Sequence, residues 1–489
     1  MPTGDKRTND DNIYMTIGKM LSIEDVEMPK DRKLRQRSIR VIYLISFFGA
    51  IACTMTMPSL WPYMKKLDPL AKPWHLGIAN GCYPLGKLIG GISFTAWHNI
   101  HGVRVPLLAC IIVDFFAFFL HALAAAFPGS NGLIMVIVAR LFNGFANGQE
   151  VVCRTVLEKS TELKKKTMQF SILFTSYSLG YAAGPGLSAF LAIILKNEYR
   201  HSFIIFDAFN APGWLGMFMQ IISFISVLIW LKEYNMNSDK ERKTENLPKP
   251  DTFALILISV SYCILYAVFS AIETLTAPLM ADELAMTKRA AVFNAGILLS
   301  FLGPIAVLSL AFVKCTSKRM SERQVILGGF TIALIGFVMF LPWGNTYPTL
   351  QTIEVIKVGN VTHTIWKEGC PAKYQWCKNT PKMHLEQIII AELMVFIGFT
   401  LPYLVTNGLY SKVVGPRKQG FYLAALSGSS CIAAIIAPLL LAYLYEHLGP
   451  RYVFVMIASV LSFLILVFTY FYSRLIPFEE YIEKIRILR

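Results

Sequence analysis

Residues 168–195 have the sequence MQFSILFTSYSLGYAAGPGLSAFLAIIL, which contains no charged side chain. A helix needs about 20 consecutive apolar residues to cross the hydrocarbon core of a bilayer, so this stretch is long enough to span a membrane. Gly184 and Pro185 near its centre do not argue against a span, because membrane helices tolerate both residues. The stretch therefore predicts a transmembrane helix.

Apolar runs of similar length recur throughout the 489 residues. The chain is 55% hydrophobic and only 16% charged, whereas a soluble domain carries about 25% charged residues. This composition excludes an ordinary soluble protein, and the continuous runs exclude the alternating pattern of a β-barrel. We predict an all-α membrane protein with twelve spans, at residues 39–61, 75–97, 104–127, 132–153, 168–195, 212–231, 252–279, 289–313, 324–343, 385–410, 421–445 and 451–473.

The charged segment 232–250 divides the spans into two sets of six. Loops with basic residues follow the second span of each set, and the fifth span of each set contains a proline. Two six-helix halves around a site at the bilayer midplane are typical of a major facilitator transporter. The predicted organisation is a cytosolic tail (1–38), a first half (39–231), a cytosolic linker (232–250), a second half (251–473) with a lumenal loop (344–384), and a second cytosolic tail (474–489).

The distribution of basic residues predicts the orientation. If the N-terminus is cytosolic, 31 of the 46 Lys and Arg residues lie on the cytosolic side and 13 on the other, with Lys87 and Arg140 inside spans. Cytosolic loops carry an excess of Lys and Arg, so both termini are predicted to be cytosolic. The net charge of +15 is then assigned to loops that face lipid headgroups, and no nucleic-acid partner is predicted.

The loop 344–384 contains the sequon Asn360-Val361-Thr362 and the cysteines Cys370 and Cys377. Glycosylation and a disulfide both require the lumenal or extracellular side, which the basic-residue count also assigns to this loop. We therefore predict a glycan at Asn360 and a disulfide between the two cysteines.

Three short motifs resemble signatures of the major facilitator superfamily. The loop after the second span keeps Gly102, although Asn99 stands at its acidic position, so the usual acid of the gate between the halves is absent there. Residues 139–144 (ARLFNG) resemble the arginine motif of span four. Residues 180–185 (GYAAGP) resemble the glycine-proline motif of span five.

A narrower resemblance covers nearly the whole chain. Its most specific element is Cys370-x6-Cys377, and further elements are RSIR (37–40), WPY (61–63), ET (273–274), LPWGN (341–345), LYSK (409–412) and GPR (449–451). The chain resembles the major facilitator superfamily domain-containing 8 family, to which the lysosomal membrane protein of neuronal ceroid lipofuscinosis type 7 belongs. This resemblance implies an endolysosomal multi-pass membrane protein with a glycosylated lumenal loop. It also implies permeation of an anion, with chloride as the substrate proposed for the family.

Charged side chains within the spans are the candidate binding residues, because each costs about 2.5–3.5 kcal/mol at the bilayer centre on insertion scales. Arg140 in span four stays protonated, and it is predicted to hold an anion or a substrate carboxylate. Its alternative role is structural pairing with an acid or with carbonyl groups. Lys87 in span two offers a second positive charge, and alternatively it forms an ion pair with Asp114 in span three, its predicted structural partner.

Glu273 in span seven and Glu392 in span ten are predicted proton carriers. Burial disfavours the charged form of a carboxyl group, so an acidic lumen could protonate either one. The alternative is an Arg140–Glu392 or Lys87–Glu273 ion pair that only holds the halves together. Glu150 and Arg154, four residues apart, are predicted to form an ordinary helical ion pair.

The glycines of span five are predicted to let helices approach closely, and its proline to bend the helix. These packing and gating candidates are Gly180, Gly184, Pro185 and Gly186, together with Gly102. The 34 Phe and 21 Tyr residues are attributed to membrane composition and interfacial belts. Tyr14 and Ile17 fit the Y-x-x-bulky pattern that sorting adaptors recognise on the cytosolic side.

No nucleotide-binding, hydrolase or metal-site motif is found in the sequence, so we expect no enzyme activity, catalytic residue, metal or cofactor. Three functions stay open. The first is permeation of chloride or another small anion across an endolysosomal membrane, attracted by Arg140 and Lys87. The second is proton-coupled transport of a small anionic metabolite, and the third is a non-transporting membrane scaffold. The predicted partners are the anion, protons, the lipid bilayer and sorting adaptors.

Overall fold

A computed structural model describes residues 29–68, 70–71, 73–127, 129–161, 165–195, 199–201, 204–231, 250–358, 361–367, 369–371, 374–415, 419–478 and 480–481. The predicted glycosylation site Asn360 and the predicted sorting residues Tyr14 and Ile17 lie outside these residues. The same holds for residues 232–249, which make up nearly all of the predicted linker.

Twelve helical passages occur among the described residues, at the places where the sequence predicts spans. The first six are α2 (Pro29–Met55) with α3 (Met57–Leu67), α4 (Pro73–His101), α5 (Arg104–Leu123), α6 (Ser130–Ala146) with α7 (Gln149–Lys159), α8 (Lys166–Ile194) and α9 (Ala211–Trp230). The second six are α11 (Thr252–Glu283), α12 (Lys288–Ser300) with α13 (Leu302–Thr316), α14 (Glu322–Met339), α15 (Leu385–Val414), α16 (Gly420–Leu448) and α17 (Pro450–Tyr470). By length and apolar composition, nine helical segments of the described chain are able to cross a membrane.

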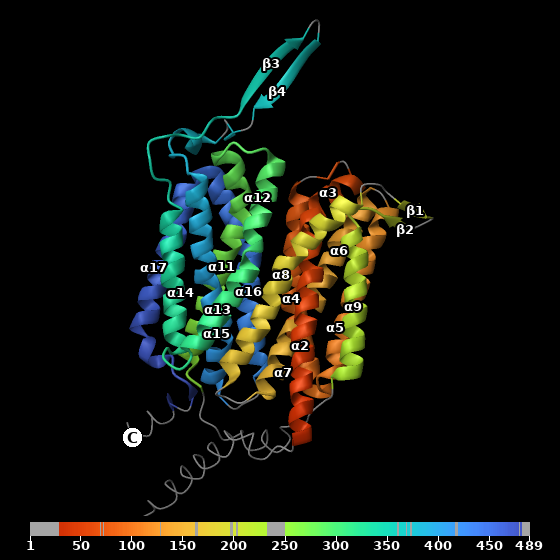
Figure 1. Cartoon of the computed structure of the whole chain (residues 1–489), viewed down its shortest axis with the longest axis vertical. Helices are drawn as coiled ribbons and strands as arrows, with labels where there is room; N and C mark the ends of the chain where they lie inside the picture. Colours follow the sequence, from red (N-terminus) through yellow and green to blue (C-terminus); the bar gives the residue numbers. More distant parts are fainter. Residues whose placement is uncertain are drawn as a thin grey trace, which may run out of the picture.

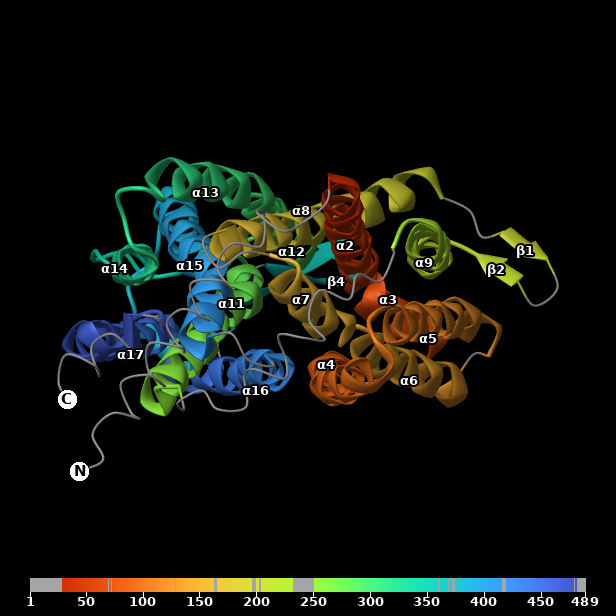
Figure 2. The same ribbon diagram turned by 90° about the horizontal axis from the view of Figure 1, so that it is seen from below.

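The helices form two groups that stand side by side, α2 to α9 in one and α11 to α17 in the other (Figure 1). Seen from below, α7 and α8 lie near the middle of the molecule, on the side of the first group that faces the second (Figure 2). α8 packs against α13 and α15 of the second group, and α4 packs against α16. These helices therefore form the interface at which a site shared by both groups must lie.

The two ends of the molecule differ. The first residues of α2 and the last residues of α17 lie at one end, which we call the terminal end, whereas the hairpin of β3 (Thr352–Val358) and β4 (Val361–Lys367) projects from the other, the hairpin end (Figure 1). An even number of helical passages places the start of α2 and the end of α17 at the same end of the molecule.

The predicted loop 344–384 contains more regular structure than expected. β3 and β4 pair antiparallel, with Thr352 opposite Lys367 and Val358 opposite Val361. A second, smaller hairpin joins α8 to α9 and is formed by β1 (Tyr199–His201) and β2 (Ile204–Phe206). The sequence signal for β3 and β4 is two runs rich in β-branched residues with Gly-Asn between them.

Several helix boundaries follow from single residues. α2 begins at Pro29, ten residues before the predicted span, so the basic segment ahead of the span is helical as well. Pro58 at the start of α3 lacks an amide hydrogen, which fits the interruption between α2 and α3. Asp251 begins α11 by accepting hydrogen bonds from the amides of Phe253 and Ala254.

Candidate functional site

A cavity of about 480 Å³ lies between the two helix groups. α2, α3, α4, α6 and α8 line it from the first group, and α11, α13, α15 and α16 line it from the second. The lining extends from Trp61 and Leu76, toward the hairpin end, to Lys87 and Tyr403, which we call its floor. The sequence analysis predicts a site at this interface of two six-helix halves.

Arg140 lines the cavity from α6 and is only 4% exposed. Its Nε and one terminal nitrogen have no hydrogen-bond partner among the described residues. Cys53, Tyr83 and Tyr181 line the same cavity, and no described carboxylate forms a salt bridge with Arg140. A buried cation without a counter-ion is costly, so Arg140 presents an uncompensated positive charge to the cavity.

Lys87 at the floor belongs to an ion-pair network of three residues. Its Nζ lies 2.5 Å from Oε2 of Glu150, and Arg154 contacts the other carboxylate oxygen of the same residue. The Glu150–Arg154 contact is the helical pair that their spacing predicts. The Arg154 guanidinium also lies over the Phe174 ring, 4.8 Å from its centroid. One carboxylate thus holds two cations, and the network keeps an excess positive charge beneath the cavity.

The predicted pairing of Lys87 with Asp114 is wrong. Asp114 on α5 instead accepts a hydrogen bond of 2.6 Å from the side-chain amide of Gln220 on α9. The reason lies in helix packing: α4, which carries Lys87, packs mainly against α6, and α7 continues α6. The carboxylate within reach of Lys87 is therefore Glu150 rather than Asp114.

Glu273 enters the cavity from α11 of the second group. Its Oε1 accepts a hydrogen bond of 2.7 Å from the hydroxyl of Tyr181 on α8. The alternative ion pairs considered from the sequence, Arg140–Glu392 and Lys87–Glu273, are both absent from the described part of the chain. The structure therefore brings Lys87, Arg140 and Glu273 to one cavity without neutralising Arg140.

Glu392 lies apart from these three residues. It is completely buried on α15, where Oε2 is 3.4 Å from the Thr276 hydroxyl of α11 and Oε1 has no described partner. It is not among the described residues that line the cavity. The two predicted proton carriers therefore occupy different environments, one facing the cavity and one inside the second helix group.

Six aromatic side chains from α8, α11 and α15 form a continuous part of the cavity lining, which we call the aromatic wall. Phe269 stacks on Phe399 with ring centroids 4.7 Å apart, and Phe399 stacks on Tyr403 at 5.2 Å. Sequence analysis missed this wall by assigning aromatic residues to membrane composition. Their three- and four-residue spacings, which place each pair on one helix face, were the available signal. The wall consists of Tyr177, Tyr181, Tyr266, Phe269, Phe399 and Tyr403.

Polar contacts join the two helix groups between the cavity floor and the terminal end. Thr167 on α8 donates a hydrogen bond of 2.9 Å to Oε1 of Glu322, the first residue of α14, and Lys412 on α15 pairs with the same oxygen. Ser171 on α8 donates to the carbonyl oxygen of Leu404 at 2.9 Å. Glu322 therefore supplies an acidic contact between the groups, although the corresponding loop of the first group has Asn99 at its acidic position.

The predicted glycines of α8 behave differently from one another. A Cβ atom at Gly180 would overlap the carbonyl oxygen of Phe47, and one at Gly184 would overlap the Thr54 hydroxyl, so both permit α8 to contact α2. At Gly186 a Cβ atom would meet no described atom within 4 Å, so the packing role expected there is wrong. Gly102 ends α4 with φ of +76° and donates its amide to the carbonyl oxygen of His98, as a helix-terminating glycine does.

A close approach of α4 to α6 was not predicted from the sequence. A Cβ atom at Gly86 or Gly90 of α4 would overlap the backbone of α6, and one at Gly144 would overlap the carbonyl oxygen of Tyr83. Glycines four residues apart are a known signal for close packing of membrane helices. This contact places Lys87, next to Gly86, close to the helix that carries Arg140.

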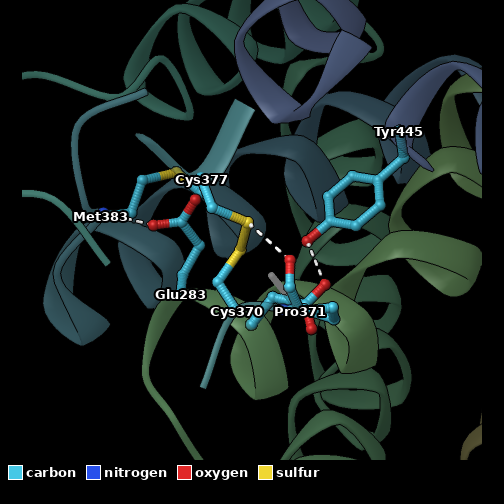
Figure 3. Close-up of a disulfide and its surroundings, with 7 residues drawn as sticks. Glu283, Cys370, Pro371, Cys377, Met383 and Tyr445 are labelled. Atoms are coloured by element: carbon cyan, nitrogen blue, oxygen red, sulfur yellow. Dashed lines mark hydrogen bonds between the residues drawn. A yellow bond between two sulfur atoms is a disulfide. The ribbon is translucent and has the colours of Figure 1, made fainter. Parts of the chain in front are cut away.

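The predicted disulfide joins Cys370 and Cys377 at the hairpin end (Figure 3). The segment around it is attached to the second helix group, because the Met383 amide donates to Glu283 at the end of α11 at 3.1 Å. Trp376 is buried against Gly449, where a Cβ atom would lie 2.6 Å from the indole ring. The described residues of the segment 369–383 are therefore packed onto this helix group.

Comparisons with known proteins agree on the fold. The sequence pattern of the Major Facilitator Superfamily matches residues 42–359. The chain is 29% identical to Major facilitator superfamily domain-containing protein 8 of Xenopus laevis, over 94% of this chain and 96% of that protein. Among solved structures, it is similar to the human organic anion transporter MFSD10 (TETRAN), with a TM-score of 0.67, 12% identity, and coverage of 90% of this chain and 100% of that one. A bacterial homologue of the iron transporter ferroportin gives a TM-score of 0.62 at 12% identity, over 88% and 98% of the two chains.

Proposed function

This chain belongs to the Major Facilitator Superfamily, and we propose that it is a secondary carrier that moves a small anion through the cavity between its two helix groups. Members of this superfamily bind substrates near the bilayer midplane, between their halves, and expose the site to the two sides in turn. The cavity described above lies between the two helix groups and is lined from both of them.

The observation that carries the proposal is the uncompensated charge of Arg140. A guanidinium is always protonated and presents a planar fork of donors that matches a carboxylate or phosphate group. An anionic substrate would supply the partner that the described protein atoms do not supply. A structural arginine would instead be expected to pair with an acid, which also makes a non-transporting scaffold the least favoured function.

Glu273 is the proposed proton-coupling residue. It faces the same cavity as Arg140 but comes from the other helix group. When Glu273 is protonated, the cavity and its floor contain three cations and one carboxylate, so anion binding is favoured. When it is ionised, a second negative charge opposes the anion. A proton and an anion would therefore be bound and released together. Glu392, which lies outside the cavity lining, is a second proposed proton site.

Alternating access is supported by the contacts at the terminal end. Glu322 links α14 to Thr167 of α8 and to Lys412 of α15, below the cavity floor. We propose that substrate enters from the hairpin end, and that its release at the other end requires these contacts to separate. The close approach of α8 to α2 at Gly180 and Gly184 would let the first group move as one body.

Passive permeation of chloride is the second candidate, and the presence of both Lys87 and Arg140 on one cavity favours it. A continuous pore would have to pass the Lys87–Glu150–Arg154 network and the contact of the Phe174 and Tyr403 rings, whose centroids are 4.6 Å apart. Permeation would thus need this floor to open, which is why we place the carrier first.

We further propose that the protein resides in an endolysosomal membrane with both termini in the cytosol and the hairpin end in the lumen. The excess of basic residues on the side of the termini supports this orientation, as does a disulfide at the opposite end. Asn360 would then carry a glycan, and Tyr14 and Ile17 would be accessible to adaptors. A glycosidase-sensitive gel shift that is lost in Asn360→Gln would test the lumenal assignment, and an unchanged gel position of the variant would contradict it.

The proposed function is tested with purified protein in liposomes. We expect uptake of chloride or of the monocarboxylate butyrate, under an imposed voltage or proton gradient. Arg140→Gln should reduce it about tenfold or more, because a lost charge-assisted hydrogen bond is worth about 1.5–3 kcal/mol. Arg451→Gln is the matched control, because Arg451 is exposed on α17 away from the cavity. Folded protein that moves no anion, or equal uptake by both variants, would contradict the proposal.

A further inference from the structure

We infer that the substrate is an amphipathic organic anion, with one acidic head group at Arg140 and a flat apolar or aromatic body against the aromatic wall. This inference rests on the proposed function, because it names the substrate class of the same cavity. It differs from that proposal in excluding an inorganic ion as the substrate to which the cavity is adapted.

The two sides of the cavity differ in chemistry. The helices α2, α4 and α6 contribute its polar side, with Arg140, Lys87, Asn80 and Cys53. The aromatic wall is contributed by α8, α11 and α15. A ligand that contacts both the polar side and the wall must therefore carry a charged end and an apolar end.

The size of the cavity argues against a monatomic ion. A chloride ion is comparable in size to a water molecule, whose share of liquid volume is about 30 Å³. The cavity volume is about 480 Å³, and cavities of about 300–1,000 Å³ typically enclose drug-sized molecules. Chloride would leave most of this space to solvent and would contact only the polar side.

The aromatic wall favours an organic body over an inorganic ion for an electrostatic reason. The face of an aromatic ring carries partial negative charge, so a bare anion gains nothing from contact with it, whereas a flat apolar group stacks well. Phe269 and Phe399 are stacked nearly parallel, with an angle of 26° between their planes, and Tyr181 lies against Phe269 at 6.0 Å. This ordered set of rings provides a surface for such a body.

The charges of the cavity favour a single negative charge on the head group. The Lys87 ammonium already contacts Glu150 at 2.5 Å. Arg140 is, within the described chain, the cavity cation without a counter-ion, while Glu273 adds a carboxyl group bound to Tyr181. A head group with one negative charge would therefore match Arg140. A second negative charge would be repelled by Glu273, and a cationic head group would be repelled by Arg140.

The test compares four probes in proteoliposomes: phenylbutyrate, butyrate, phenylbutylamine and chloride. Phenylbutyrate and butyrate share the acidic head, whereas phenylbutyrate and phenylbutylamine share the ring. We expect the KM of phenylbutyrate to be at least about tenfold below that of butyrate, because a ring that leaves water contributes about 1.4 kcal/mol or more. Neither chloride nor phenylbutylamine should compete with it at the same concentration.

Substitutions distinguish the contribution of the aromatic wall to binding from that of Arg140. Phe269→Leu should raise the KM of phenylbutyrate several-fold and leave that of butyrate unchanged, whereas Arg140→Gln should reduce uptake of both acids about tenfold or more. Phe463→Leu is the matched control, because Phe463 is exposed on the outer side of α17. Unchanged size-exclusion profiles would show that the variants are folded.

The outcomes are distinguishable. Butyrate or chloride handled as well as phenylbutyrate, with dependence on Arg140 retained, would overturn the substrate class and leave the proposed function in place. Preference for phenylbutylamine would overturn the acidic head group. Uptake of none of the anions by folded protein would overturn the proposed function together with this inference.

Discussion

The hydroxyl of Tyr181 on α8 donates a hydrogen bond of 2.7 Å to Oε1 of Glu273 on α11. Both residues line the same cavity as Arg140 of α6. The hydrogen bond joins a side chain of the first helix group to the carboxyl group that the second group contributes. Because Glu273 and Arg140 share one cavity, a change in the charge of Glu273 alters the electrostatic environment of an anion bound there.

The first prediction concerns proton coupling. Wild-type anion uptake should rise when the hairpin side is acidified from about pH 7 to about pH 5, a range in which a buried carboxyl group can change its charge. Glu273→Gln should make uptake equal at the two values, because the amide cannot titrate. Glu386→Gln is the control, since it removes an exposed carboxylate that is not part of the described cavity lining and should keep the pH dependence. Retained pH dependence in Glu273→Gln would assign the coupling to another residue, with Glu392→Gln tested next.

The second prediction concerns the network at the cavity floor. Glu150→Gln leaves Lys87 and Arg154 without their shared counter-ion, and breaking a buried ion pair from one side costs about 3–5 kcal/mol. We expect a clear drop in the apparent melting temperature of the purified protein. Glu386→Gln removes an exposed carboxylate from the first turn of α15 and should have little effect. Equal melting of the two variants would show that the network does not stabilise the floor.

The third prediction compares two glycines of α8 that are two residues apart. Gly184→Ala should destabilise the protein by about 1–3 kcal/mol, because the new Cβ would overlap Thr54 and lie 2.8 Å from the Met55 amide nitrogen. Gly186→Ala has open space around it and should be neutral or stabilising by up to about 1 kcal/mol, because alanine favours the helix. Thermal unfolding followed by tryptophan fluorescence measures both, and a reversed order would contradict the described packing of α8 on α2.

The fourth prediction concerns the segment 369–383. Replacing both Cys370 and Cys377 by serine should cost about 2–4 kcal/mol of stability, because the disulfide restricts the unfolded chain. Cys315→Ser is the control, since Cys315 is exposed and unpaired. Transport should be retained where the protein stays folded, because the segment is outside the cavity lining. Melting of the double variant at the temperature of the control would show that the segment is held by its other contacts.

The contacts that are easiest to predict from the sequence join residues that are close together in the chain. The i,i+4 spacing of Glu150 and Arg154 is enough to predict their contact, and the shared loop is enough to pair Cys370 with Cys377. Arg140 and Glu273 stand out because a charge within an apolar run is rare and costly. The partners of Lys87 and Asp114 could not be predicted in the same way, because these depend on which helices touch.

The amino-acid sequence by itself determined the twelve helical passages, because uncharged apolar runs of this length are stable as helices that satisfy their own backbone hydrogen bonds. Only the tertiary structure decided what the charges face. The glycine contacts of α4 with α6 bring Lys87 to Glu150, and the packing of α8, α11 and α15 places aromatic rings in the cavity that Arg140 also lines. These contacts join residues far apart in the chain, and they arise from the shapes of packed helices rather than from any local pattern. The chemical character of the cavity is therefore a property of the fold.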